Sequence, residues 1–265
     1  MNSDQNDGKA DSLSTAIFPS ATEASKIVAR ELSDAIRSRN NKGQAIVLGL
    51  ATGSTPIKVY QELVRLHKEE SLSFANVRTF NLDEYYGLAP THAESYNAFM
   101  EKHLFSSIDI PSEAAIVPDG MVPREEVFAY CEDFEKSILD AGGIDIQVLG
   151  IGRTGHIGFN EPGSSRSSRT RLVHLDSITK KDAAQAFGGA GNVPPNAITM
   201  GVETILAARK IYLLAWGAPK AKILAKALED PISEKLPASF LQKHKNTNVF
   251  LDQAAAVEIT KGKNR

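Results

Sequence analysis

The sequence predicts a single α/β domain built on a mostly parallel sheet with helices on both faces. Short, nearly continuous apolar runs alternate with longer segments whose apolar residues recur at helical spacing. Such continuous runs are typical of strands that are buried on both faces. The 265 residues contain no internal repeat and no linker-like composition, so we expect one domain rather than two.

The expected elements follow one another along the chain. Five β-rich runs are expected to form strands: 45–50, 77–82, 144–151, 211–216 and 248–252. Four segments with helical spacing are expected to form helices: 21–39, 56–67, 127–139 and 219–228. The polar residues 1–15 are expected to form a disordered tail, which leaves 16–265 as the domain.

Composition excludes several classes of protein. With 30 basic and 32 acidic residues, the net charge of −2 argues against nucleic acid as a partner held by a basic field. No run of about 18 apolar residues occurs, so no transmembrane helix and no membrane partner are expected. The single cysteine, Cys131, excludes an internal disulfide and a cysteine-based zinc cluster. No signal peptide is expected either, and the cytoplasm is the expected compartment.

The turn after the first expected strand is the first candidate site, because ligands of parallel sheets bind beyond the carboxyl ends of the strands. Thr52, Gly53, Ser54 and Thr55 form this turn. A small turn at a helix N-terminus exposes backbone N–H groups and favours phosphate. The Gly-Lys-Ser/Thr ending of a Walker A loop is missing. The alternative is an ordinary turn in which Ser54 or Thr55 caps the helix.

Two acids follow the second expected strand. Asp83 and Glu84 are neighbours, so in strand geometry they point to opposite faces and only one of them enters a given site. A carboxylate at a strand end is well placed to act as a general base. A solvated acid pair, or a cap of the next turn, is the alternative.

The third turn, residues 150–163, contains a G-x-G-x-x-G pattern that does not fit dinucleotide binding. That fingerprint needs a helix to begin inside it, and Gly158, Pro162 and Gly163 break any helix here. The segment instead predicts a loop that carries His156 and Glu161. Histidine is suited to proton transfer near neutral pH, and a carboxylate can fix its tautomer. A structural loop histidine is the alternative.

Lys220 is the last local candidate. It is expected in the first turn of the helix 219–228, where a cation opposes the helix dipole. An anionic ligand would relieve this mismatch. An exposed lysine without a ligand explains the position equally well.

Together these motifs resemble the glucosamine-6-phosphate deaminases, within the superfamily of 6-phosphogluconolactonases and sugar-phosphate isomerases. The resemblance spans residues 16–256 and rests on LGLATGSTP, FNLDEYYGL, SYNAFM, GHIGFNEPGSS, SRTR, AITMGVETI and PASFLQKH, in this order. The lactonases differ in the histidine loop and lack the Phe-Asn-Glu-Pro ending. The resemblance implies a modified Rossmann-like fold.

The resemblance also implies an activity. D-glucosamine 6-phosphate and water would give D-fructose 6-phosphate and ammonia, without a metal or an organic cofactor. Asp83 would move the proton between C2 and C1, His156 would open the pyranose ring, and Glu161 would support the histidine. The turn 52–55 would hold the phosphate with Lys220 as its cation. The partner would be an amino-sugar phosphate, and a homo-oligomer is possible because relatives include hexamers and monomers.

Three positions depart from the family pattern. Thr154 stands where Asp or Asn is usual, and a hydroxyl carries no charge to stabilise an imidazolium, so either activity is lower or Glu161 takes more of this role. Gln185 stands where many members have a phosphate-binding arginine, for which Lys180, Lys181 or Arg171 is a possible substitute. Val173 replaces a lysine of the allosteric members, which predicts weak or absent activation by N-acetylglucosamine 6-phosphate.

Two further functions stay open at this point. One is a related sugar-phosphate isomerase or lactonase, which Thr154 motivates. The other is a non-catalytic sugar-phosphate sensor, because related domains serve transcription regulators. The presence of Asp83, His156 and Glu161 together argues against the sensor.

Overall fold

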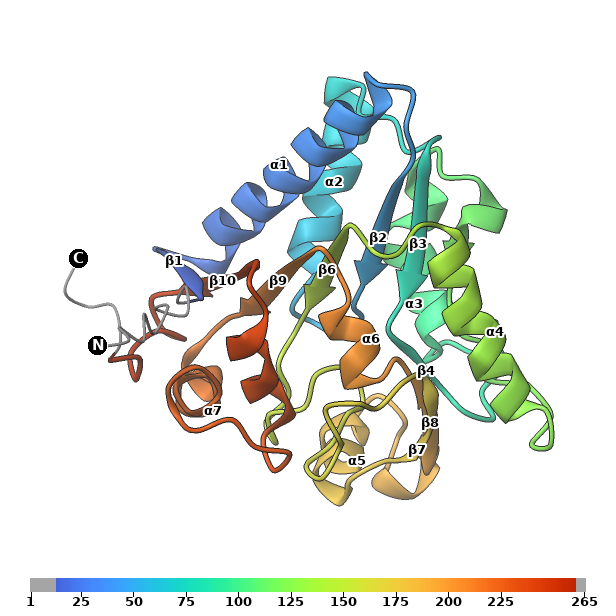
Figure 1. Cartoon of the computed structure of the whole chain (residues 1–265), viewed down its shortest axis with the longest axis vertical. Coiled ribbons are helices and arrows are strands. Elements are labelled where there is room, and N and C mark those ends of the chain that lie inside the picture. Colours follow the sequence, from blue (N-terminus) through green and yellow to red (C-terminus); the bar gives the residue numbers. More distant parts are fainter. Residues whose placement is uncertain (1–12, 261–265) are drawn as a thin grey trace, which may run out of the picture.

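A seven-stranded parallel sheet runs through the centre of the molecule (Figure 1). The computed structural model describes residues 13–260. The strand order is β1-β10-β9-β6-β2-β3-β5, and every adjacent pair is parallel. The strands are β1 (Ser14–Phe18), β2 (Ile46–Leu50), β3 (Val77–Asn81), β5 (Ala115–Ile116), β6 (Ile146–Leu149), β9 (Lys210–Ala215) and β10 (Thr247–Asp252).

Helices cover both faces of this sheet, which confirms the predicted fold class. α1 (Ala21–Asn40), α2 (Ile57–Glu70) and α3 (Tyr96–His103) pack on one face and share a buried core with it. α4 (Val127–Asp140), α6 (Val202–Leu206) and α7 (Ala218–Glu229) pack on the other face around a second core. Figure 1 shows these two layers on either side of the strands.

Two cores explain why the strands are apolar without interruption. In β2, Leu48 contributes to the core under α1 and α2, and its neighbour Val47 contributes to the core under α4 and α7. A strand buried on both faces has no position for a solvent-facing polar residue. The five predicted strands and four predicted helices are all present, with boundaries shifted by at most a few residues.

A second, smaller sheet lies beyond the carboxyl ends of the central strands, and the sequence did not predict it. It is antiparallel, with β8 (Asn196–Thr199) between β4 (Asp83–Tyr85) and β7 (Arg171–His174). The short helix α5 (Ser177–Ala183) follows β7 and lies at the bottom of Figure 1. Short 3₁₀ turns occur at Phe105–Ser107, Ser112–Ala114, Ala190–Asn192 and Pro237–Lys243.

The N-terminal boundary of the domain differs from the expected one. Ser14 and Thr15 belong to β1, because they pair with Asn248 and Val249 of β10. The rest of the expected tail, residues 1–12, lies outside the described residues. No helix within residues 13–260 is long and apolar enough to cross a membrane.

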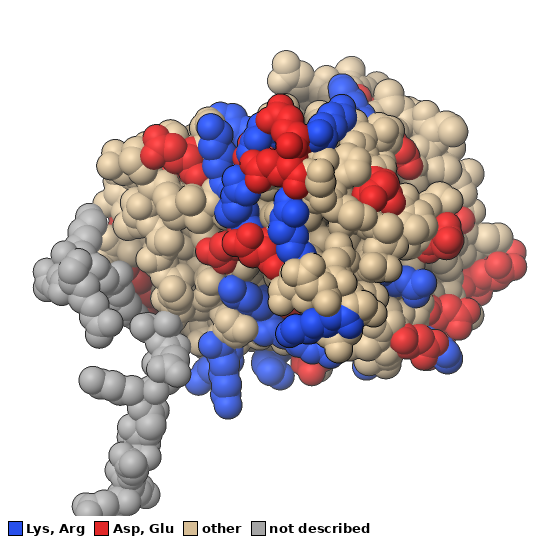
Figure 2. All heavy atoms as spheres, turned by 90° about the horizontal axis from the view of Figure 1, so that it is seen from above, with Lys and Arg blue, Asp and Glu red and all other residues tan. Residues whose placement is uncertain are grey.

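Charges of both signs interleave on the face seen from above in Figure 1 (Figure 2). An ion-pair network also joins α1 and α2. Arg30 of α1 contacts Glu70 at 2.6 Å, and Arg65 reaches both Glu62 and Glu70 of its own helix. This face therefore offers no field of a single sign to a polyanion.

Candidate active site

A cavity of about 360 Å³ opens where β2, β6 and β9 end and β4 begins. This volume suits a small ligand such as a sugar phosphate. The residues lining it include most of the predicted site: Thr52, Gly53, Ser54, Thr55, Asp83, His156 and Lys220. Glu161 and Thr154 lie behind His156 and contact its ring rather than the cavity.

The turn 52–55 follows β2 directly and forms one wall of the cavity. Gly53 has φ +90°, a conformation that side chains with a Cβ rarely adopt. The alternative in which Ser54 or Thr55 caps the next helix does not hold, because no side chain caps this helix. Pro56 occupies the cap position in a helical conformation, so the two hydroxyl residues precede the helix and line the cavity instead.

Lys220 lies in the first turn of α7, as predicted. Its ammonium donates a hydrogen bond to the Ile151 carbonyl at 2.7 Å. Burial lowers the pKa of Lys220, an effect that the charge of Asp182 partly offsets. A partly buried ammonium at the positive end of a helix is a favourable place for an anion.

Asp83 opens β4 and lines the cavity with 6% of its surface exposed. Burial, together with the charge of Glu84, raises the pKa of the Asp83 carboxyl well above its usual value. The backbone approaches this carboxylate closely at Gly158, where a Cβ would lie 3.3 Å from Asp83 Oδ2. Gly158 has φ +57°, so the position has two reasons to be glycine.

Glu84 points away from the cavity, as the strand alternation predicted. Its carboxylate accepts hydrogen bonds from the backbone N–H groups of Tyr85, Tyr96 and Asn97 at 2.8, 2.9 and 2.9 Å. Burial raises its pKa to about 6 despite these bonds. Glu84 therefore fastens β4 to α3, and Asp83 alone of the pair reaches the cavity.

His156 also lines the cavity and belongs to a hydrogen-bond network. Its Nδ1 lies 3.0 Å from Glu161 Oε2 and 2.9 Å from the Thr154 hydroxyl. Thr154 donates to the same Glu161 oxygen at 3.0 Å, and Thr179 of α5 donates to the other one. With Nδ1 engaged, Nε2 is the nitrogen that can act on a ligand.

Hydrogen bonding, not burial, decides the charge of Glu161. Burial raises the pKa of its carboxyl, but hydrogen bonds from His156, Thr179 and Thr154 outweigh this effect and hold the pKa below its usual value. An ionised Glu161 favours a proton on His156 Nδ1. The loop around the ring is irregular, and Gly152 lies against the ring, since a Cβ there would lie 2.0 Å from His156 Nε2. The rejection of the dinucleotide fingerprint is thus confirmed.

No group of three or more histidine, cysteine, aspartate or glutamate side chains within residues 13–260 is arranged to hold a metal ion. Two titratable groups of the cavity, Asp83 and His156, have different surroundings. Asp83 stands among apolar and aromatic neighbours, and His156 is bound to a carboxylate. Such a separation is typical of acid–base chemistry.

A model of the family described as glucosamine-6-phosphate isomerases/6-phosphogluconolactonase matches residues 19–250. The chain belongs to this family. Glucosamine-6-phosphate deaminase 2 of Giardia intestinalis is 45% identical, over 95% of this chain and 94% of that protein. A glucosamine-6-phosphate deaminase-like protein of Bacteroides thetaiotaomicron is 43% identical over 96% of this chain. This chain spans only 38% of the length of that protein.

A solved structure of a monomeric glucosamine-6-phosphate deaminase has the same fold. It superposes with a TM-score of 0.88 at 42% identity, covering 93% of this chain and all of that one.

The sequence prediction missed an aromatic wall of the cavity. The rings of Tyr85 and Tyr96 lie 4.9 Å apart, and Phe159 packs on both, at 5.4 and 5.8 Å. All three line the cavity beside Asp83. Strand alternation could have placed Tyr85 on the same face as Asp83. Tyr96 comes from α3, which no pattern predicted.

The expected substitutes for the family's lid arginine do not reach the cavity. Of the lysine and arginine side chains in residues 13–260, Lys220 and Arg153 line it, whereas Lys180, Lys181 and Arg171 do not. Arg171 instead donates to Asn160 and Ser164. Gln185 does not line the cavity either. Arg153, Thr179 and Asp182 are the polar lining residues that the sequence prediction missed.

Proposed function

We propose that this chain converts D-glucosamine 6-phosphate and water to D-fructose 6-phosphate and ammonia in amino-sugar catabolism. The observation that carries the proposal is the shared cavity: a buried carboxylate, Asp83, and a carboxylate-bound imidazole, His156, line it together with an anion cradle. Aldose–ketose isomerisation needs a base and a ring-opening group around a substrate that is fixed at one end.

The phosphate is proposed to bind at the turn 52–55. Hydroxyls of Thr52, Ser54 and Thr55 and the backbone around Gly53 would donate hydrogen bonds to it. Lys220 would supply the positive charge. Fixing the phosphate at this end orients C1 and C2 of the sugar toward the rest of the cavity.

Ring opening is assigned to His156. Its Nε2 would accept the proton of the C1 hydroxyl and deliver a proton to the ring oxygen, which breaks the C1–O bond and gives the open aldehyde. Glu161 stabilises the imidazolium that forms in between, because its carboxylate lies 3.0 Å from Nδ1. Thr154 would orient this carboxylate through its own hydrogen bond.

The proton transfer between carbons is assigned to Asp83. Its carboxylate would take the proton from C2, so that a C1=C2 double bond forms while the aldehyde oxygen gains a proton. Return of the proton to C1 gives an iminium at C2. Water then adds at C2 and the C–N bond breaks, which releases ammonia and leaves the ketone. Because the oxygen of water ends on C2, the overall deamination is hydrolytic.

We also place this enzyme in the cytoplasm. Cys131 is the one cysteine of the chain, and it is buried and unpaired. A free thiol suits a reducing compartment.

The test is a paired measurement of both products. Purified protein incubated with glucosamine 6-phosphate is expected to release ammonia and fructose 6-phosphate in equal amounts. Asp83→Asn should abolish both, whereas Asp140→Asn, on the exposed side of α4, should leave both unchanged. Hydrolysis of 6-phosphogluconolactone in place of deamination would show a lactonase. Substrate binding without turnover would show a sensor.

A further inference from the structure

An ion pair stands at the edge of the cavity, between the histidine loop and α5. Arg153 Nε donates to Asp182 Oδ2 at 2.9 Å, and Arg153 Nη2 lies 2.5 Å from Asp182 Oδ1. Both residues line the cavity, as do the turn 52–55 and Lys220. The contact is two-pronged, and both side chains are about half exposed, at 55% and 43%.

Asp182 is an unexpected residue beside the turn 52–55 and Lys220, the proposed phosphate site. A carboxylate there repels a phosphate dianion, and its charge is close enough to Lys220 to raise that lysine's pKa, while Arg153 lowers it. An acid in this position is explained if it neutralises a cation that also binds the ligand. Arg153 is that cation, because Asp182 forms an ion pair with it.

The cavity also lacks a guanidinium from the lid. Gln185 is uncharged, and Lys180, Lys181 and Arg171 do not line the cavity. Within residues 13–260 this leaves Lys220 and Arg153 as its lysine and arginine cations. A guanidinium matches phosphate oxygens through parallel hydrogen bonds, which an ammonium cannot do.

We propose that Arg153 is a phosphate-binding residue, which pairs with Asp182 until a phosphorylated ligand takes the place of that carboxylate. The proposal rests on the proposed function, which puts the phosphate at the turn 52–55. An exposed ion pair contributes little stability, so a dianion with Lys220 beside it can displace a single carboxylate. Arg153 thereby selects ligands that carry a phosphate, and Asp182 keeps weaker anions out.

If a phosphorylated ligand displaces Asp182 from Arg153, substitution of Arg153 and substitution of Asp182 should change phosphate binding in opposite directions. Binding is measured by titration calorimetry with inorganic phosphate and with fructose 6-phosphate. Arg153→Ala is expected to raise both dissociation constants about tenfold, the loss of one charge-assisted contact, and Arg153→Lys should recover part of it. Asp182→Asn is expected to lower both about threefold, because the competing anion is gone while the shape is kept. In the deaminase assay, KM should follow these changes and kcat should not.

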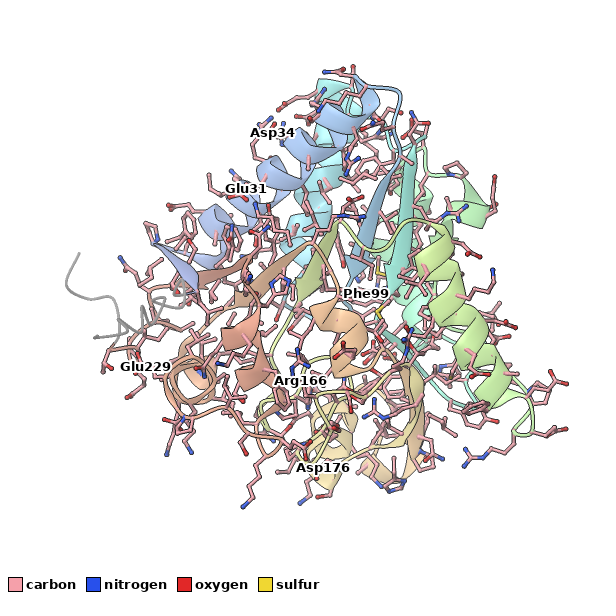
Figure 3. All side chains as sticks on the ribbon, viewed as in Figure 1. Glu31, Asp34, Phe99, Arg166, Asp176 and Glu229 are labelled. Atoms are coloured by element: carbon pink, nitrogen blue, oxygen red, sulfur yellow. The ribbon has the colours of Figure 1, made fainter. Side chains whose placement is uncertain are left out.

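The Arg166–Glu203 pair is a matched control, with side chains 57% and 47% exposed and outside the cavity. Figure 3 labels Arg166 and also Asp176, the N-cap of α5. Arg166→Ala and Glu203→Gln should leave phosphate binding unchanged.

A purely structural ion pair gives a different result, since both variants would then weaken binding alike. That result, unchanged binding in Arg153→Ala, or no phosphate binding by the wild-type protein would overturn the proposal. A wild-type protein that binds phosphate but releases no ammonia would instead count against the proposed function alone, because the calorimetric comparison needs no turnover.

Discussion

At the scale of single residues, the buried Asp83 carboxylate lowers the stability of the folded protein when it is ionised, and it is also the proposed base. Its folded-state pKa lies above the unfolded value, so its contribution to stability is fully present below the unfolded pKa and is lost as the pH rises through the folded pKa. Asp83→Asn removes the buried charge. We expect this variant to lose activity by about 10³-fold or more and to melt at a higher temperature than the wild type at pH 8.

Thermal melts from pH 4 to pH 8 check this prediction. The difference in melting temperature should shrink toward pH 4, where the wild-type carboxyl becomes protonated and resembles the amide. Asp140→Asn serves as the exposed control. A difference that grows toward acid pH would contradict the assignment of a raised pKa to Asp83.

Thr154 and Glu161 both contact His156, but only Glu161 carries charge. We therefore expect Glu161→Gln to lower kcat about 100-fold and the near-isosteric Thr154→Val to lower it about 3- to 10-fold, because the valine removes one hydrogen bond to the Glu161 carboxylate but leaves its charge in place. Steady-state kinetics of both variants provide the comparison. Equal losses would mean that the Thr154 hydroxyl matters as much for the histidine as the charge of Glu161 does.

At the scale of elements, Glu135 clamps α4 to the small sheet and to α6. Its buried carboxylate accepts hydrogen bonds from Thr170 N at 2.7 Å, from the Thr170 hydroxyl at 2.6 Å and from the Thr204 hydroxyl. Arg169 pairs with it at 2.8 Å. Glu135→Leu leaves these donors buried without their acceptor, so we expect a loss of about 3 kcal/mol in the free energy of unfolding.

The pH dependence of the stability should show that the contacts of the Glu135 carboxylate are ionic. Burial raises the pKa of Glu135, but its hydrogen bonds outweigh burial and lower it below the usual value. Its stabilisation is therefore present above the unfolded pKa and lost as the pH falls through the folded pKa. Urea melts of Glu135→Leu should approach those of the wild type in acid, with the exposed Glu132→Gln as control. A constant difference at every pH would rule out the ionic contribution.

At the scale of the whole molecule, a second hollow lies beside the candidate active site, with which it shares Phe159, and is formed by the loop 161–168 and β7. Arg171 and Val173 both line it. Arg171 is the one lysine or arginine among the described residues that line it, and Val173 adds no second cation beside it, so we expect an anionic effector to bind weakly there. We expect the rate to depend hyperbolically on glucosamine 6-phosphate, with weak or absent activation by N-acetylglucosamine 6-phosphate. Cooperative activation by that ligand would overturn this prediction.

Elements with long, uninterrupted patterns could be predicted from the sequence. The strands 45–50 and 211–216 and the helix 21–39 each bury a run or a stripe that has one periodicity. The small sheet escaped prediction because β4 has three residues, and β7 and β8 four each. Strands this short are stabilised by their partners rather than by their own pattern.

The helix after β2 shows where local rules gave the wrong answer. Ser54 and Thr55 are good capping residues, yet Pro56 takes the cap position and leaves both in the cavity lining. Capping preference describes an isolated helix end. It does not account for a turn whose residues line a cavity instead.

By itself the sequence determined the central sheet, the order of the loops, and the candidates Asp83, His156, Glu161 and Lys220, because burial periodicity and strand-end position are local properties of the chain. Only the tertiary structure decided that Thr179 touches Glu161 and that Asp182 faces Arg153. Both come from α5, a short helix without a clear apolar stripe. Its place depends on packing against distant segments, and no local pattern encodes such contacts.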